Sequence, residues 1–202
     1  MTFRKEYKFR VTFSDYHKFH DLLYKQGLVS LFNPRVIHSV YFDTADLRMF
    51  HDSEEGVRPR KKVRIRWYND EKIFFQENKV SSFEGRYKTS KKLECMSSED
   101  QIANKVLLDS AYGSVHPVLK VSYRRSYFSL NNLRLTFDES ITYQKILQND
   151  RRIYCDPERV IEIKTPANFS DDFVEKYIPY PTVRFSKYSR GLLLFVSDIN
   201  EI

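Results

Sequence analysis

The alternation of apolar and polar residues along the chain predicts mainly β-strands. In the segment VRIRW, a strand places two arginines, Arg64 and Arg66, on one face and the three apolar residues on the other. An arginine face in bulk water is ordinary for an antiparallel sheet, whereas an arginine face that lines a cavity requires an anionic ligand. Which interpretation applies depends on whether the other predicted strands also carry cations on one face.

Similar alternation predicts an α+β fold with eight or nine mainly antiparallel strands in one domain, 1–202. The candidate segments for these strands are 3–11, 36–43, 60–68, 72–80, 86–93, 118–129, 133–138, 140–147, 151–154 and 159–164. The expected helices are one capped by Ser14 and ending at Gly27, a turn at 46–51, one from Ser97 or Ser98 to 111, one opened by Ser170, and 187–196. We expect these strands to form a large sheet or a closed barrel.

The charge balance favours an anionic partner. The chain has 34 Lys and Arg against 27 Asp and Glu, a net charge of +7 and a pI near 9.3. Its two cysteines lack metal-binding spacing, which indicates reduced thiols and a cytoplasmic location. The N-terminus is no signal peptide, and the longest apolar run, 192–196, is far short of the ~20 residues that span a bilayer. We therefore expect no direct membrane insertion, and any membrane role would come through a partner protein.

Cations recur near the middle of the predicted strands, on one face of each. They are Lys8, Arg64, Arg66, Lys79, Lys88, Arg125, Arg134 and Lys164, with Glu6, Glu77 and Glu162 among them. Arginine suits two-pronged contacts with phosphate oxygens. This face is therefore either open to water and uninformative, or a site for a polyanion.

Other kinds of site lack their motifs. The sequence has no G-x-x-x-x-G-K-[ST] loop and only five glycines, so phosphate would be held by side chains. It has no H-E-x-x-H, no G-x-S-x-G and no Cys-His pattern of a hydrolase. It also has no RNP1-like or helix-turn-helix signature, so we expect no nucleic-acid partner.

An ordered set of short motifs resembles a known family. The motifs are FRKEYKF (3–9), YFDT (41–44), VRIRWY (63–68), FFQENK (74–79), YRRSYF (123–128), LRLTFD (133–138), VIEIK (160–164) and RFSKYSRG (184–191). Together they resemble the catalytic domain of the vacuolar transporter chaperone (VTC) polyphosphate polymerases. That family belongs to the triphosphate tunnel metalloenzyme superfamily, which has the CYTH-like fold.

The resemblance implies an eight-stranded, mainly antiparallel β-barrel with flanking helices, whose tunnel binds a triphosphate and a growing chain. It implies catalytic roles for Arg64, Arg66, Lys79, Arg125, Arg134 and Lys187, and substrate binding by Lys8, Lys88, Lys164, Arg184 and Ser186. It also implies Mn²⁺ or Mg²⁺ on Glu162, helped by Glu6 or Glu77. Two departures are Arg4, where the superfamily has the first glutamate of E-x-E-x-K, and Arg184 in place of a lysine.

The expected activity is metal-dependent transfer of the γ-phosphate of a nucleoside triphosphate to polyphosphate. An inorganic or nucleoside triphosphatase, and a non-catalytic module that binds nucleotide, polyphosphate or tripolyphosphate, remain alternatives. The phosphate-sensing and membrane segments of the eukaryotic enzymes are not in this sequence, so a stand-alone bacterial version is expected. Asp43 and Thr44 are expected to organise a turn. Substitution of Lys62 or Lys91 is expected to have little effect.

Overall fold

The computed structural model describes residues 4–131, 133–146, 152–166, 174, 178 and 180–197. The strands are β1 (Arg4–Val11), β2 (Val29–Asp43), β3 (Arg60–Tyr68), β4 (Phe75–Ser81), β5 (Arg86–Lys92), β6 (Leu107–Asp109), β7 (Gly113–Leu130), β8 (Leu133–Lys145), β9 (Ile153–Cys155) and β10 (Arg159–Pro166). The helices whose residues are described throughout are α1 (Phe13–Lys25), α2 (Arg48–Glu55), α3 (Asp100–Ala103) and α5 (Lys187–Ser197).

The strands form one sheet in the order β1-β10-β8-β7-β2-β3-β4-β5, with β6 beside β7 and β9 beside β8. The pairs β1–β10, β10–β8, β2–β3, β3–β4, β4–β5 and β6–β7 are all antiparallel. The predicted fold class, α+β with a mainly antiparallel sheet and flanking helices, is confirmed, and eight strands form the main path of the ten-stranded sheet.

The chain divides into two compact units, each assembled from three separate segments. Unit 1 comprises Met1–Val36, Tyr123–Ile141 and Cys155–Phe185. Unit 2 comprises Ile37–Ser122, Thr142–Tyr154 and Ser186–Ile202. The long strands β2, β7 and β8 run through both units, because each crosses a boundary between these segments.

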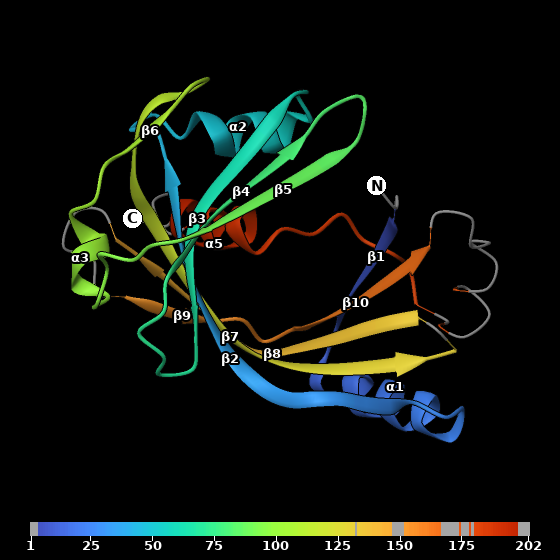
Figure 1. Ribbon diagram of the computed structural model, residues 1–202. Helices are drawn as coiled ribbons and strands as arrows, with labels where there is room; N and C mark the ends of the chain where they lie inside the picture. The colour runs from blue at the N-terminus through green and yellow to red at the C-terminus, as the bar shows by residue number, and fades with distance from the viewer. Residues whose placement is uncertain are drawn as a thin grey trace. The chain divides into compact units, whose positions relative to one another are not determined.

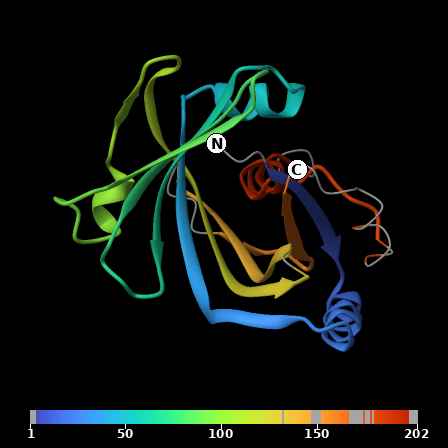
Figure 2. The ribbon, with the colours of Figure 1, turned by 45° about the vertical axis from the view of Figure 1, so that its right-hand side comes forward.

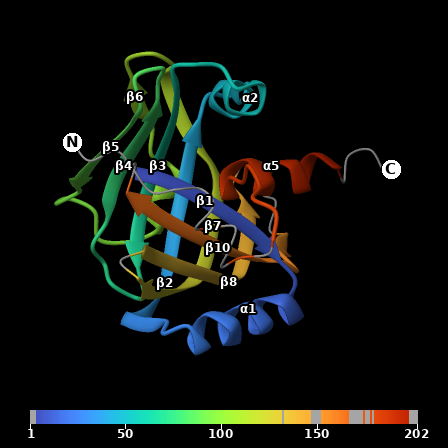
Figure 3. The same cartoon turned by 90° about the vertical axis from the view of Figure 1, so that its right-hand side faces the viewer.

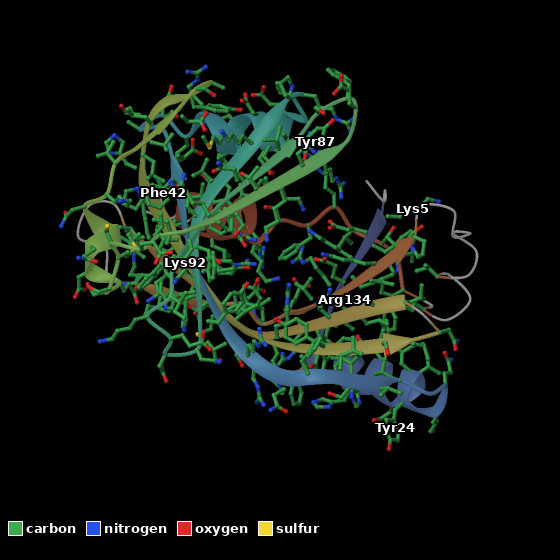
Figure 4. All side chains as sticks on the ribbon, viewed as in Figure 1. Lys5, Tyr24, Phe42, Tyr87, Lys92 and Arg134 are labelled. Atoms are coloured by element: carbon green, nitrogen blue, oxygen red, sulfur yellow. The ribbon has the colours of Figure 1, made fainter. Side chains whose placement is uncertain are left out.

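The core of unit 1 lies between α1 and one face of its strands. Phe9, Phe137 and Ile161 point to this face from β1, β8 and β10, and Phe19 and Leu23 of α1 pack against them. Figures 1 and 3 show α1 beneath the strands of its unit, and Tyr24 points away from them into solvent in Figure 4. Because side chains alternate along a strand, Lys8, Asp138 and Glu162, each next to one of these apolar residues, point to the opposite face.

The start of α1 differs from the prediction. Thr12, and not Ser14, is the N-cap, and its hydroxyl oxygen accepts a hydrogen bond from the Asp15 amide at 3.2 Å. Thr12 and Ser14 both lie close to the start of the apolar repeat, but Thr12, directly after β1, has the extended backbone conformation that an N-cap requires. The helix ends at Lys25, and Gly27 follows with φ of +94°.

The core of unit 2 lies against the apolar face of β3. Val63, Ile65 and Trp67 are buried there, with Phe42 of β2 and Met49 of α2 among their neighbours. This is the division of β3 into an apolar and a basic face that the sequence predicted. Figure 2 shows β3, β4 and β5 running side by side in this unit.

The predicted helix from Ser97 or Ser98 to 111 is wrong. Helix α3 has only four residues, and Leu107–Asp109 forms β6, paired with the start of β7. The Gln101 side-chain oxygen accepts from the backbone N–H groups of Ser97 and Ser98 at 2.9 and 3.4 Å, so neither serine side chain caps the helix.

The remaining differences concern the limits of elements. Strand β2 begins seven residues before the predicted 36, and the predicted strands 133–138 and 140–147 are one continuous strand, β8. Ser140, within β8, has φ of +51°, so the backbone of the strand is irregular there. The apolar and polar alternation of the sequence is interrupted at the same place, which is why two strands were predicted. The predicted helix after Ser170 begins outside the described residues, whereas α5 is confirmed. Among the described helices, none combines the length and apolar character needed to cross a membrane.

Candidate functional site

On the polar face of β3, Arg64 and Arg66 share one buried carboxylate. Glu77 of β4 stands opposite Arg64 in the antiparallel register and is 4% exposed. Arg64 donates to Glu77 Oε2 from Nε at 2.8 Å and from Nη2 at 2.6 Å. Arg66 Nη1 lies 3.7 Å from the same oxygen, and Lys88 Nζ of β5 lies 2.6 Å from Oε1. Three cations that the sequence predicted on one face are therefore held together.

These cations keep the carboxyl group of Glu77 ionised. Burial alone would raise its pKa. The charges of Arg64 and Arg66, together with hydrogen bonds from Lys88 and Arg64, outweigh burial and lower the pKa of Glu77 to about 2. The cluster therefore carries three positive charges and one negative charge at neutral pH.

Three lysines, Lys62, Lys79 and Lys88, stand side by side across β3, β4 and β5, and we call them the lysine row. Like charges directly opposite one another destabilise a sheet, so an anion bound along this row would relieve their repulsion. Lys62 Nζ also donates to Ser186 Oγ at 2.7 Å. From the sequence, substitution of Lys62 was expected to have little effect. Lys62 nevertheless lies two residues before Arg64 on β3, so its side chain is on the same face as Arg64 and Arg66. That spacing in the sequence could have identified it as a residue of the candidate site.

The predicted site residues Ser186 and Lys187 stand at the start of α5, which a buried tyrosine anchors. The Tyr188 hydroxyl donates to the Asp43 carboxylate, and its ring stacks on Tyr41 with centroids 4.9 Å apart. Burial first, and then the charge of Asp43, raises the pKa of Tyr188 well above its usual value. Tyr41 in turn accepts from Arg64 Nη1 at 3.0 Å.

Asp43 also organises the turn before α2, as the sequence predicted. Its carboxylate accepts from the backbone N–H groups of Met49 and Phe50, each at 2.9 Å, and from that of Thr44 at 2.7 Å. One carboxylate therefore fixes the first turn of α2 and the tyrosine of α5.

A second charged cluster occupies the polar face of unit 1. Glu162 of β10 stands opposite Lys8 of β1, and Glu6 stands opposite Lys164. Lys164 Nζ lies 3.1 Å from a Glu162 oxygen and 3.5 Å from a Glu6 oxygen. Burial would raise the pKa of Glu162, but the charges of Lys164, Lys8 and Arg125 lower it to about 2. Glu162 and Glu6, two of the predicted metal ligands, therefore both contact the Lys164 ammonium.

Arg125 of β7 is held by a buried carboxylate from β8. Its Nε and Nη2 donate to the two oxygens of Asp138 at 2.6 and 2.7 Å, and Asp138 is 1% exposed. Burial would lower the pKa of Arg125, but the charge of Asp138 raises it well above its usual value.

The other predicted residues of unit 1 lie on or beside this polar face. Arg134 is exposed on β8, opposite Lys164 and on the side away from α1 (Figure 4). Lys8 donates to the Phe185 carbonyl oxygen at 2.9 Å, and the Val183 N–H donates to the Lys8 carbonyl oxygen at 2.8 Å. Arg184, between them, is exposed.

Comparison with known proteins decides the family. The family model of the VTC domain matches residues 3–196. The chain belongs to the VTC domain family. No curated protein matches this VTC domain.

Several solved structures share its fold. A conserved hypothetical protein from Pyrococcus furiosus has a TM-score of 0.57 at 14% identity, over 92% of this chain and 99% of that chain. A candidate adenylate cyclase from Bacillus halodurans has a TM-score of 0.56 at 16% identity, over 91% and 95%. A candidate adenylyl cyclase from Hippeastrum, described as revealing a dominant triphosphatase activity, has a TM-score of 0.52 at 16% identity, over 93% and 94%. These likenesses show that the chain shares the fold of these proteins.

The carboxylates of this VTC domain suit a hard divalent ion only in part. Among the described residues, no group of three or more His, Cys, Asp or Glu side chains could surround a metal. Glu162 and Glu6 nevertheless face one shared cation, the ammonium of Lys164. Mg²⁺ is commonly held by one or two carboxylates, with waters and phosphate oxygens as its other ligands. The pair Glu162 and Glu6 fits that pattern.

Proposed function

We propose that this VTC domain transfers the γ-phosphate of a nucleoside triphosphate to a polyphosphate chain with the help of Mn²⁺ or Mg²⁺. The observation that carries this proposal is the concentration of cations on the polar face of β3, β4 and β5. The lysine row lies there beside Arg64 and Arg66, and the Glu77 carboxylate contacts Lys88 and both arginines. A face with this excess of positive charge suits a substrate with several phosphate groups.

The chain's own residues supply electrostatic stabilisation. Arg64, Arg66 and Lys187 are proposed to neutralise charge on the transferring phosphoryl group, which is the main requirement of such reactions. Lys79, Arg125 and Arg134 are proposed to share this role, and Lys8, Lys88, Lys164, Arg184 and Ser186 to bind the substrate. The nucleophile, a terminal phosphate, is already anionic, so no histidine base is needed.

Glu162, with Glu6, is the proposed metal-binding pair. A bound Mn²⁺ or Mg²⁺ would neutralise charge on phosphate oxygens. The Lys164 ammonium contacts both carboxylates, so a metal ion would have to displace it to bind this pair.

A triphosphatase is the second candidate. The dominant triphosphatase activity described for the Hippeastrum protein of the same fold favours it. A triphosphatase must position a water molecule instead of a phosphate chain, and a glutamate of the site would do this.

The reaction products distinguish the two activities. The protein is incubated with ATP and Mn²⁺, and the products are separated by size and assayed for free orthophosphate. Chains of phosphate support the polymerase, and orthophosphate alone supports the triphosphatase. Protein that binds tripolyphosphate but consumes no ATP with any divalent ion is a binding module.

Replacing Glu162 with Gln tests the metal site. If Glu162 holds the metal, Glu162→Gln keeps tripolyphosphate binding in EDTA and loses Mn²⁺-dependent ATP consumption, because charge neutralisation on the phosphoryl group is lost. ATP consumption is measured with and without Mn²⁺, and tripolyphosphate affinity is measured in EDTA. Tighter tripolyphosphate binding with unchanged turnover would show that Glu162 is only a counter-charge.

A further inference from the structure

We propose that Glu77 is a positioning residue that holds Arg64, Arg66 and Lys88 ready for a phosphate ligand. This inference rests on the proposed function, because it assigns the role of one carboxylate within the same site. It differs from the sequence-based expectation that Glu77 helps to bind the metal.

The oxygens of Glu77 are occupied by protein cations. Oε2 accepts two hydrogen bonds from Arg64 and lies 3.7 Å from Arg66, and Oε1 contacts the Lys88 ammonium at 2.6 Å. A carboxylate has about four lone-pair sites. The Glu77 side chain is 5% exposed, so a metal ion would have to displace at least one of these cations to reach it.

The same contacts fix the orientation of both guanidinium groups. Arg64 is held by Glu77 on one side and by the Tyr41 hydroxyl on the other, at 3.0 Å. Arg66 lies beside Glu77 and donates from Nε to Ser39 Oγ, also at 3.0 Å. Groups that are already oriented lose little entropy when the ligand arrives, so this arrangement strengthens phosphate binding.

Glu77 achieves this without cancelling the positive charge of the site. Three cations contact one carboxylate, which leaves two net positive charges on the cluster. Two models therefore make opposite predictions for Glu77→Gln. If Glu77 only opposes the anion, its neutralisation tightens phosphate binding, and if Glu77 positions the arginines, its neutralisation weakens binding although positive charge is gained.

The experiment measures tripolyphosphate affinity in EDTA by calorimetry for the full chain and two variants. Glu77→Gln is compared with Glu71→Gln, which removes the same charge from the exposed turn between β3 and β4. We expect about a tenfold or greater loss of affinity for Glu77→Gln, the loss typical of a charged hydrogen bond, and no loss for Glu71→Gln. Equal or tighter binding by Glu77→Gln overturns the inference.

A charge-conserving variant guards against misfolding of Glu77→Gln. Arg64→Lys keeps the positive charge and loses the two-pronged contact with Glu77, so we again expect about a tenfold loss. Melting curves establish that the variants are folded. Wild-type affinity in Arg64→Lys would overturn the inference, because it would show that orientation is unimportant.

Manganese titration separates positioning from metal binding. We expect Glu77→Gln to need the same Mn²⁺ concentration for half-maximal ATP consumption as the wild type, with a raised KM for ATP. Unchanged tripolyphosphate affinity in EDTA with a raised Mn²⁺ requirement would make Glu77 a metal ligand and overturn the inference. If the wild type does not bind tripolyphosphate at all, the proposed function itself fails.

Discussion

Two site arginines, Arg64 and Arg125, are each held by a carboxylate thirteen residues further along the chain, Glu77 and Asp138 respectively. Both pairs join neighbouring strands of the sheet, and both carboxylates are almost completely buried. Removing one partner of such a pair leaves a buried charge without compensation, which is strongly destabilising. Each carboxylate therefore stabilises the position of its arginine in the candidate site.

For single residues, the alternation of side chains along a strand predicted the face that each residue of the candidate site occupies. It could not predict which side chain on the neighbouring strand would be its hydrogen-bond partner. Arg64 and Arg66 share a face because of the strand period alone. The pairing of Arg64 with Glu77 depends on register, and register depends on the length of the loop between β3 and β4. The predicted strand begins at 72 and the observed one at Phe75, so partners counted from the sequence would have been wrong.

Lys62 provides a test at the residue scale. Lys62→Ala should weaken tripolyphosphate binding several-fold, because it removes one charge of the lysine row and its contact with Ser186. Lys91→Ala is the matched control, since Lys91 is exposed on β5 and alternates with Lys88 to the opposite face. Affinity is measured at low salt, where phosphate contacts are strongest. Equal effects at the two positions would indicate a merely basic surface.

At the scale of elements, the strands were predicted best and the helices less well. Strand β3 has the predicted limits because its alternation is unbroken from Lys62 to Tyr68. The segment 97–111 has helix-forming residues, but Leu107–Asp109 pairs with Gly113–Val115 instead. That choice depends on the long strand β7 that follows, so the local sequence could not show it.

Gly191 tests how closely α5 must pack. A Cβ at this position would lie 2.5 Å from Tyr143 Cδ1 and 2.6 Å from Leu119 Cδ2, both on buried side chains. Gly→Ala normally stabilises a helix, but here we expect Gly191→Ala to reduce the free energy of unfolding by about 1–3 kcal/mol through overpacking. Urea unfolding measures this change, and Leu193→Ala, at an exposed position of α5, is the control. A more stable Gly191→Ala protein would show that α5 can shift without cost.

For the whole molecule, the two buried glutamates predict sensitivity to acid. The pKa values of Glu77 and Glu162 are lowered to about 2 from the ordinary 4.5. A depressed pKa adds stability that is fully present above the unfolded-state pKa and is lost as the pH falls towards the folded-state pKa. Each glutamate thus contributes on the order of 3 kcal/mol to the free energy of unfolding, and this contribution is lost between about pH 4.5 and pH 2.

Denaturant unfolding at a series of pH values measures this loss. We expect the free energy of unfolding to fall steeply below pH 4.5 in the wild type and less steeply in Glu77→Gln, which has no carboxyl group to protonate there. Parallel curves for the two proteins would contradict the pKa assigned to Glu77.

The division of the chain into interleaved segments has a consequence for its biosynthesis. Unit 1 needs residues from Met1–Val36 and from Cys155–Phe185, and unit 2 needs Ser186–Ile202 as well as Ile37–Ser122. A ribosome makes these residues in order, so neither unit is complete until at least 185 residues have been made. The nascent chain must therefore keep its early β-strands from pairing wrongly while these residues are made, at roughly 5–20 residues per second. The two units are expected to complete their folding late, through contacts between distant parts of the chain.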